Sequence, residues 1–272
     1  MKSRITLTFI AILIFSVLSY AQGPWAKKDW KQWSKDDCKK VLEDSPWSYK
    51  WIESTPKTAN FATPSQGTGG VGSDSDVAAY YIVQIRSARP VRAAVVRQML
   101  IQNNYDKSED NVKKNMDAQT QGYLDRSYED VIVVHVVYGS ENADYNRSLA
   151  AFWQNHFPEG YIPVDTLFHG SNGQKISPTK IISPKNGAQE FEFVFPRSVD
   201  GKPLIEADAK TIGIEFDTPG SNSTGSAAHV AIGTSQNTSV GGVRTSVGGV
   251  KGGRVFVEFK VDKMKMDGKL IY

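Results

Sequence analysis

Three arginines, Arg86, Arg89 and Arg92, lie close together where an apolar segment meets the start of an expected helix. The carboxyl end of a strand beside a helix N-terminus is a common ligand position, and the N–H groups at that end attract anions. The cluster could therefore bind a carboxylate or a phosphate group. The alternative is that the arginines pair with acidic side chains at the surface, as most charge clusters do.

Aromatic residues are concentrated in one short stretch, because five of the six tryptophans lie between Pro24 and Trp51. Trp47, Tyr49 and Trp51 alternate with other residues, and on a strand they would share one face. Exposed flat rings on such a face would suit a carbohydrate-binding module. The alternative is that these rings cover the core, because tryptophan buries a large apolar area.

The sequence has no local motif for catalysis or metal binding. Three pairs of acidic residues lie two positions apart: Glu190/Glu192, Glu206/Asp208 and Glu215/Asp217. A glycosidase needs two carboxylates, but acidic pairs with this spacing are also common on a solvated sheet face. No histidine has a metal-ligand neighbour at the usual spacing; the histidines are His135, His156, His169 and His229. We expect His135, inside an apolar run, to be a hydrogen-bonded core residue. We predict no metal and no cofactor.

Two further features could suggest chemistry. The glycines of segment 67–72 match the dinucleotide-binding fingerprint as a string, but no strand precedes them and no helix follows. Cys38 has no second cysteine to pair with, so we expect a small buried thiol, with an intermolecular disulfide as the alternative.

Residues 1–21 have the pattern of a secretory signal peptide. Lys2 and Arg4 precede an apolar run that ends at Leu18, and Ala21 stands at a suitable cleavage position. The run is short for a bilayer span, which needs ~20 apolar residues. We therefore predict a secreted or periplasmic protein that begins near Gln22, with no transmembrane segment after cleavage.

Loss of Lys2 and Arg4 takes the formal charge from +3 to about +1. A nearly neutral chain gives no electrostatic reason to bind nucleic acid. The expected partner is an unidentified protein or glycan.

The elements that would position these residues begin with a Trp-rich segment, 22–52. Ser34 and Asp37 form a near capping box for a helix that ends at Ser45-Pro46, because a residue before proline avoids helical geometry. A short strand with the aromatic face follows. Segment 53–76 is then a flexible linker, since 14 of its 24 residues are Gly, Ser, Thr or Pro.

Segment 77–160 is expected to be a strand–helix–helix–strand–helix unit. Apolar runs predict strands at 77–86 and 131–138, and periodic patterns predict helices at 90–104, from Ser108 onwards, and at 142–156. The second helix would bury the stripe Val112, Met116, Thr120 and Tyr123. The two strands are expected to pair in parallel across the helices.

Segment 161–272 has the period-two pattern of an antiparallel sheet or sandwich. Phe191, Phe193 and Phe195 would share one face, and four Asn-Gly or Asp-Gly pairs predict tight turns. A mobile loop is expected at 217–253, where the string SVGGV occurs twice. The predicted fold class is α+β, with an N-terminal helix and an α/β unit followed by an antiparallel β-sheet or sandwich.

Two stretches resemble uncharacterised exported proteins of soil bacteria of the Acidobacteria type. The first contains Trp30, Trp33, Asp37, Cys38, Leu42 and Ser45-Pro46-Trp47, and the second is the Arg-Ser-Ala-Arg-Pro-Val-Arg segment 86–92. The resemblance implies export and assigns no activity. Because no local catalytic or metal motif is present and long flexible loops are expected on a β-rich scaffold, the favoured function is an exported binding or interaction protein. The alternatives are a secreted hydrolase with dispersed catalytic residues and a carbohydrate-binding module that uses Trp47, Tyr49 and Trp51.

Overall fold

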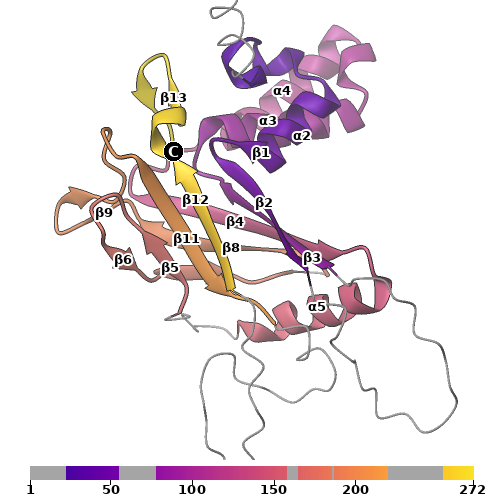
Figure 1. The fold of residues 1–272 in the computed structure, drawn as a ribbon. Coiled ribbons are helices and arrows are strands. Elements are labelled where there is room, and N and C mark those ends of the chain that lie inside the picture. The colour runs from indigo at the N-terminus through magenta and orange to yellow at the C-terminus, as the bar shows by residue number, and fades with distance from the viewer. Residues whose placement is uncertain (1–22, 55–77, 158–164, 186, 220–253) are drawn as a thin grey trace, which may run out of the picture.

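Two antiparallel sheets packed face to face form the body of the protein in the computed structural model (Figure 1). The structure describes residues 23–54, 78–157, 165–185, 187–219 and 254–272. The predicted signal peptide, most of the predicted linker and most of the predicted loop at 217–253 lie outside these residues. The fold is α+β with antiparallel sheets, as predicted from the sequence.

The larger sheet has six strands in the order β1-β2-β3-β4-β8-β7. Their bounds are β1 Asp44–Ser45, β2 Ser48–Ser54, β3 Ala78–Ile85, β4 Val131–Ser140, β7 Lys180–Ile182 and β8 Glu190–Pro196. The smaller sheet has the order β12-β11-β5-β6. Its bounds are β5 Leu167–His169, β6 Lys175–Ile176, β11 Thr211–Asp217 and β12 Arg254–Lys260.

The expected parallel pairing of the first two long strands is wrong, because β3 and β4 pair antiparallel. The helices α3 (Arg89–Gln102) and α4 (Asp110–Leu124) form a hairpin between them. This hairpin returns the chain to the end of the sheet at which β3 finished, so β4 runs back along β3. A parallel pair would need a crossover to the opposite end. Strand β8 then pairs with β4, so the middle and C-terminal segments share one sheet.

Aromatic side chains fill the space between the sheets. Phe191, Phe193 and Phe195 all point inward, since alternate residues of a strand lie on the same face. Phe216 of β11 crosses the interface, with its ring centroid 5.8 Å from that of Tyr81 and 5.7 Å from that of Phe193. These contacts join the two sheets, and the strands of segment 161–272 are divided between both sheets, so they do not form a sheet or sandwich of their own.

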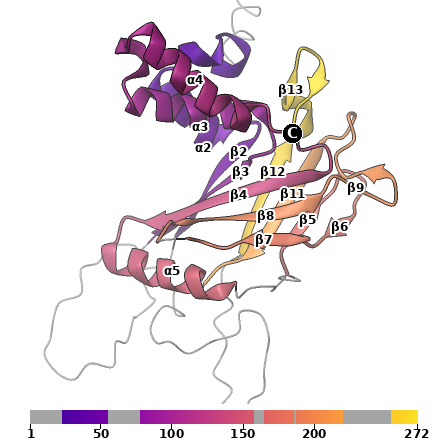
Figure 2. The same cartoon turned by 180° about the vertical axis from the view of Figure 1, so that it is seen from behind.

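Helix α5 (Ala143–His156) packs at one end of the two sheets, and α2 (Lys35–Glu43), α3 and α4 lie at the opposite end (Figure 2). The side chain of Asn142 caps α5 by accepting from the backbone N–H groups of Asp144 and Tyr145. The α5 residue Trp153 is almost fully buried, with its ring centroid 4.5 Å from that of Phe191. The helix therefore contributes directly to the aromatic core.

Two of the predicted tight turns close short ribbons. Asp200 and Gly201 both have positive φ and join β9 (Ser198–Val199) to β10 (Lys202–Pro203). Asp267 and Gly268 do the same between β13 (Lys265–Met266) and β14 (Lys269–Leu270). A two-residue loop needs positive φ at both positions to match the twist of the strands, which explains the Asp-Gly sequence.

The predicted helix cap is confirmed at α2 (Lys35–Glu43), where Ser34 and Asp37 form a complete capping box. The helix buries Cys38, Val41 and Leu42. For α4 the expected apolar stripe is partly wrong, because Val112 is exposed and Leu124 is buried.

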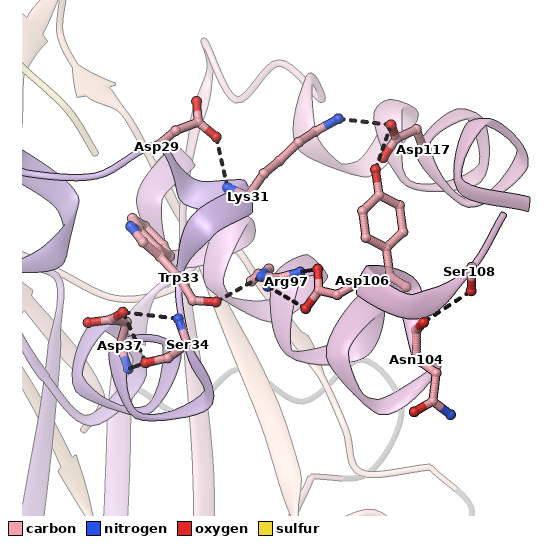
Figure 3. A network of polar contacts seen from close by, with 11 residues as sticks. Asp29, Lys31, Trp33, Ser34, Asp37, Arg97, Asn104, Asp106, Ser108 and Asp117 are labelled. Carbon is pink, nitrogen blue, oxygen red and sulfur yellow. Dashed lines mark hydrogen bonds and ion pairs between the residues drawn. The ribbon is translucent and has the colours of Figure 1, made fainter. Parts of the chain in front are cut away.

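A polar network fastens the N-terminal segment to α3 and α4 (Figure 3). Buried Arg97 donates from Nε to the carbonyl oxygen of Trp33 at 2.8 Å, and its two terminal nitrogens bind both oxygens of Asp106. Lys31 reaches Asp117 of α4, with 2.8 Å between Nζ and Oδ2. The paired geometry at Asp106 holds the guanidinium in one orientation. The Trp-rich segment is thereby anchored to the body.

Candidate functional site

One member of the predicted arginine cluster, Arg92, makes its hydrogen bonds within the fold. Its Nε and Nη2 donate to the carbonyl oxygen of Leu124, and its Nη1 donates to the carbonyl oxygen of Ser87. The guanidinium carbon also lies 4.8 Å from the ring centroid of Tyr128. Carbonyl groups at the end of α4 attract a cation, which accounts for a buried arginine at this position.

The other two arginines contact Tyr123 and Asp125, the residues on either side of Leu124. Arg89 is exposed, and its Nη2 lies 4.0 Å from Asp125 Oδ1. Arg86 is half-buried and donates from Nη1 to the Tyr123 hydroxyl at 3.1 Å. All three arginines therefore contact consecutive residues at the end of α4, and the positive charge of Arg86 also acts on Glu190 and Glu192 of the larger sheet.

The predicted aromatic sugar platform is also corrected by the structure. Trp47 has no exposed surface, and its Nε1 donates to the carbonyl oxygen of Ile271 at 2.6 Å. Its ring packs edge-on against Trp25, at a centroid distance of 5.7 Å. Trp51 is half-buried against the core, and only Tyr49 is exposed. Trp47 is covered by Trp25 and by the segment at Ile271, so the three rings present no continuous flat surface.

A different polar group lies on the outer face of the larger sheet, around His135 of β4. The strand register places Ser48, Gln84, His135 and Glu192 side by side on four neighbouring strands. Gln84, His135 and Glu192 alternate with buried apolar residues, and Ser48 is in register with them, so all four side chains lie on the face away from the aromatic core. Ser48, Gln84 and His135 are nonetheless buried.

His135 lies between two glutamates of β8. Its Nδ1 is 3.2 Å from Glu192 Oε1, and its Nε2 is 3.3 Å from Glu190 Oε2. The second pair is at ion-pair distance but is poorly aligned for a hydrogen bond. Neutral imidazole has one N–H donor, so it can serve one of these carboxylates, whereas imidazolium can donate to both. The Glu190 side chain is 53% exposed, which opens this end of the row to solvent.

Both glutamates favour the ionised form. Contact with His135 lowers the pKa of Glu190, and the positive charge of Arg86 adds to the effect. Burial opposes ionisation of Glu192, but the hydrogen bond with His135 and the charge of Arg86 outweigh it, so this pKa is lowered too. A glycosidase needs one carboxyl group with a raised pKa to act as the acid. This pair therefore lacks the proton donor of such an enzyme.

Several buried polar atoms beside His135 have no hydrogen-bond partner among the described residues. They are Ser48 Oγ, Gln84 Oε1 and Arg86 Nε. Gln84 is held in place because its Nε2 donates to the carbonyl oxygen of Leu42 at 2.7 Å. Buried polar groups are normally paired, so a cluster of unpaired ones marks a place where a polar partner would be favourable.

The sequence singled out the residues of this site, but it did not indicate that they lie close together in the fold. His135 was expected to be a hydrogen-bonded core residue, and it is buried with a carboxylate partner as expected. Glu190 and Glu192 were expected on a solvated face, yet Glu192 is mostly covered. The alternation of the strands indicated which residues point outward. The pairing of β4 with β8 was needed to bring them together.

The remaining candidate residues do not join this site. Cys38 is fully buried, and burial raises the pKa of its thiol to about 11. His156 stacks on Phe152 at a centroid distance of 4.7 Å, and burial lowers its pKa. His229 and the glycine string at 67–72 lie outside the described residues.

Within the described part of the chain, no group of three or more His, Cys, Asp or Glu side chains is arranged to hold a metal ion. No helix among the described residues is long and apolar enough to cross a membrane. Comparison with protein-family models, curated proteins and solved structures finds no match. Functional inference therefore depends on the chemistry of the site.

Proposed function

We propose that this protein is an exported binding protein that holds a positively charged amino group at Glu190, Glu192 and His135. The observation that supports this function is the position of His135 between two glutamates whose pKa values are both lowered. Among the described residues, neither carboxylate makes an ion pair with an arginine or a lysine, so both can accept from an amino cation. Glu190, at the exposed end, is the first contact for the ligand.

The geometry supports binding rather than catalysis. One oxygen of each carboxylate is near His135, and the other is available as an acceptor for ammonium N–H groups. Such charge-assisted hydrogen bonds are stronger than those between neutral groups. His135 is buried and held by Glu192, which limits the ordering cost of binding.

Titration of the ¹⁵N-labelled protein with butylamine, followed by NMR, tests the proposed binding site. Saturable shifts are expected at the amides of His135 and Glu192, because butylammonium supplies one amino cation and little else. An equal concentration of acetate should leave these amides unchanged. Glu190→Gln and Glu192→Gln should weaken the amine response, and the exposed control Glu141→Gln should not. A response that is absent, or unchanged in both site variants, would contradict the proposal.

Export is tested separately, by expression of the full chain in a bacterial host. The expected product is found outside the cytoplasm, and N-terminal sequencing should give a chain that begins at Gln22. Retention of Met1 on a cytoplasmic product would contradict export without affecting the binding proposal.

A further inference from the structure

A second polar group lies on the outer face of the smaller sheet, away from the site at His135. The register places Glu215 of β11 opposite Phe256 of β12, and Asp217 opposite Arg254. On the other side of β11, His169 of β5 is opposite Gly213. No described helix lies over this face, which is turned toward the viewer in Figure 1. Residues of three strands thus contribute to one open surface.

Ion pairs hold the polar side chains of this surface in place. Arg254 donates from Nε to Asp217 Oδ1 at 2.8 Å and from Nη1 to Glu215 Oε1. The Asp217 contact raises the pKa of Arg254, with a further contribution from the charge of Glu215. The other oxygen of Glu215 lies 2.7 Å from His169 Nε2. The chain Asp217–Arg254–Glu215–His169 is therefore ordered before any ligand arrives.

The polar chain lies beside an exposed aromatic ring. Phe256 is 42% exposed, although it is a large apolar side chain, and its ring centroid is 5.3 Å from that of His169. The ring extends over Gly213, where an added Cβ would lie 3.0 Å from the Phe256 Cε2 atom. The absence of a side chain at Gly213 allows the ring to lie in this position. One side of the ring is supported by the sheet and the rest is open.

We propose that this surface binds a neutral oligosaccharide, with one pyranose ring against Phe256 and its hydroxyl groups on Arg254, Glu215 and His169. The C–H face of a pyranose is apolar and packs on an aromatic ring, while its rim carries hydroxyl groups that donate and accept. Among the described residues, Arg254 Nη2 and His169 Nδ1 have no hydrogen-bond partner and can serve those hydroxyls. A sugar needs this combination of an apolar surface and ordered polar groups.

The charge of the surface favours a neutral ligand. Glu215 and Asp217 share the positive charge of Arg254, so no free cation faces an anionic sugar. Their acceptor positions are also partly used by Arg254 and His169, which disfavours a second cation. This site differs in residues and sheet from the one at His135, so neither proposal depends on the other.

Isothermal titration of the purified protein with cellohexaose, mannohexaose and xylohexaose, beside polygalacturonate, tests the inference. At least one neutral hexamer should bind. Phe256→Ala should weaken that binding by about tenfold or more, since an aromatic contact contributes about that factor. Phe256→Leu keeps an apolar side chain but removes the ring, so it should also bind the hexamer more weakly than the wild type. This variant tests the ring contact if Phe256→Ala does not fold. His169→Gln should weaken binding less.

Two matched controls define the result. Tyr49→Ala removes the exposed ring of β2, and Glu141→Gln changes an exposed carboxylate outside both sites. Both variants should bind the hexamer as the wild type does. The inference is overturned if no neutral hexamer binds, if only polygalacturonate binds, or if folded Phe256→Leu binds as tightly as the wild type.

Discussion

The guanidinium of Arg92 donates two hydrogen bonds to the carbonyl oxygen of Leu124, with N···O distances of 3.3 and 3.2 Å. This contact joins the first turn of α3 to the last turn of α4 and closes the helical hairpin that follows β3. The direction of β4 depends on that hairpin. Arg92 thus stabilises the connection between the two central strands of the larger sheet.

Replacement of Arg92 by Met should lower the free energy of unfolding by about 2–4 kcal/mol, because buried carbonyl oxygens lose their donors. Urea unfolding followed by circular dichroism measures the change. Arg89→Ala is the matched control, since Arg89 is an exposed arginine on the same helix with a weak contact. Its effect should stay within about 0.5 kcal/mol. Equal effects of the two substitutions would contradict the structural role of Arg92.

Replacement of Trp47 by Ala should destabilise the protein by about 3–5 kcal/mol, because it opens a cavity in the core and removes the bond to Ile271. Thermal unfolding should show a lower midpoint. Tyr49→Ala, at the neighbouring exposed ring, should cost less than about 1 kcal/mol. A small effect at Trp47 would mean that its ring is free at the surface, which would restore the sugar platform.

The thiol of Cys38 should be unreactive in the folded protein. Its pKa is raised to about 11 by burial, so little thiolate exists at about pH 8 and no reagent can reach it. Ellman's reagent should release almost no chromophore from native protein and one equivalent after denaturation in guanidinium chloride. Rapid labelling of native protein, or a disulfide-linked dimer on a non-reducing gel, would be inconsistent with this burial.

Stability should fall in acid through the two glutamates beside His135. Their pKa values are lowered on folding, so they stabilise the folded state fully above their unfolded value of about 4.5. That contribution is lost as the pH falls through the lower folded values. Urea midpoints measured from about pH 6 to pH 3 should drop more steeply for wild type than for Glu192→Gln. The control Glu141→Gln should follow the wild type. Parallel curves for Glu192→Gln and wild type would contradict the assignment.

Local features could be predicted from the sequence alone. The capping box of Ser34 and Asp37, the Asp200-Gly201 turn and the inward face of Phe191 and Phe193 all agree with the structure. Their physical causes lie within a few residues of the chain: a side chain near a backbone N–H, a residue that tolerates positive φ, or a period of two. The α+β class follows from such local patterns.

The candidate sites depend on contacts that no local pattern contains. Arg92 and Leu124 are 32 residues apart, and His135 and Glu192 are 57 apart. Each pair meets because strand register and helix packing are chosen for the burial of the whole core. The same constraint made β3 and β4 antiparallel, and it buried Trp47 while it left Phe256 at the surface. Residue type and spacing thus set the local elements, whereas tertiary packing decided which polar groups and rings can meet a ligand.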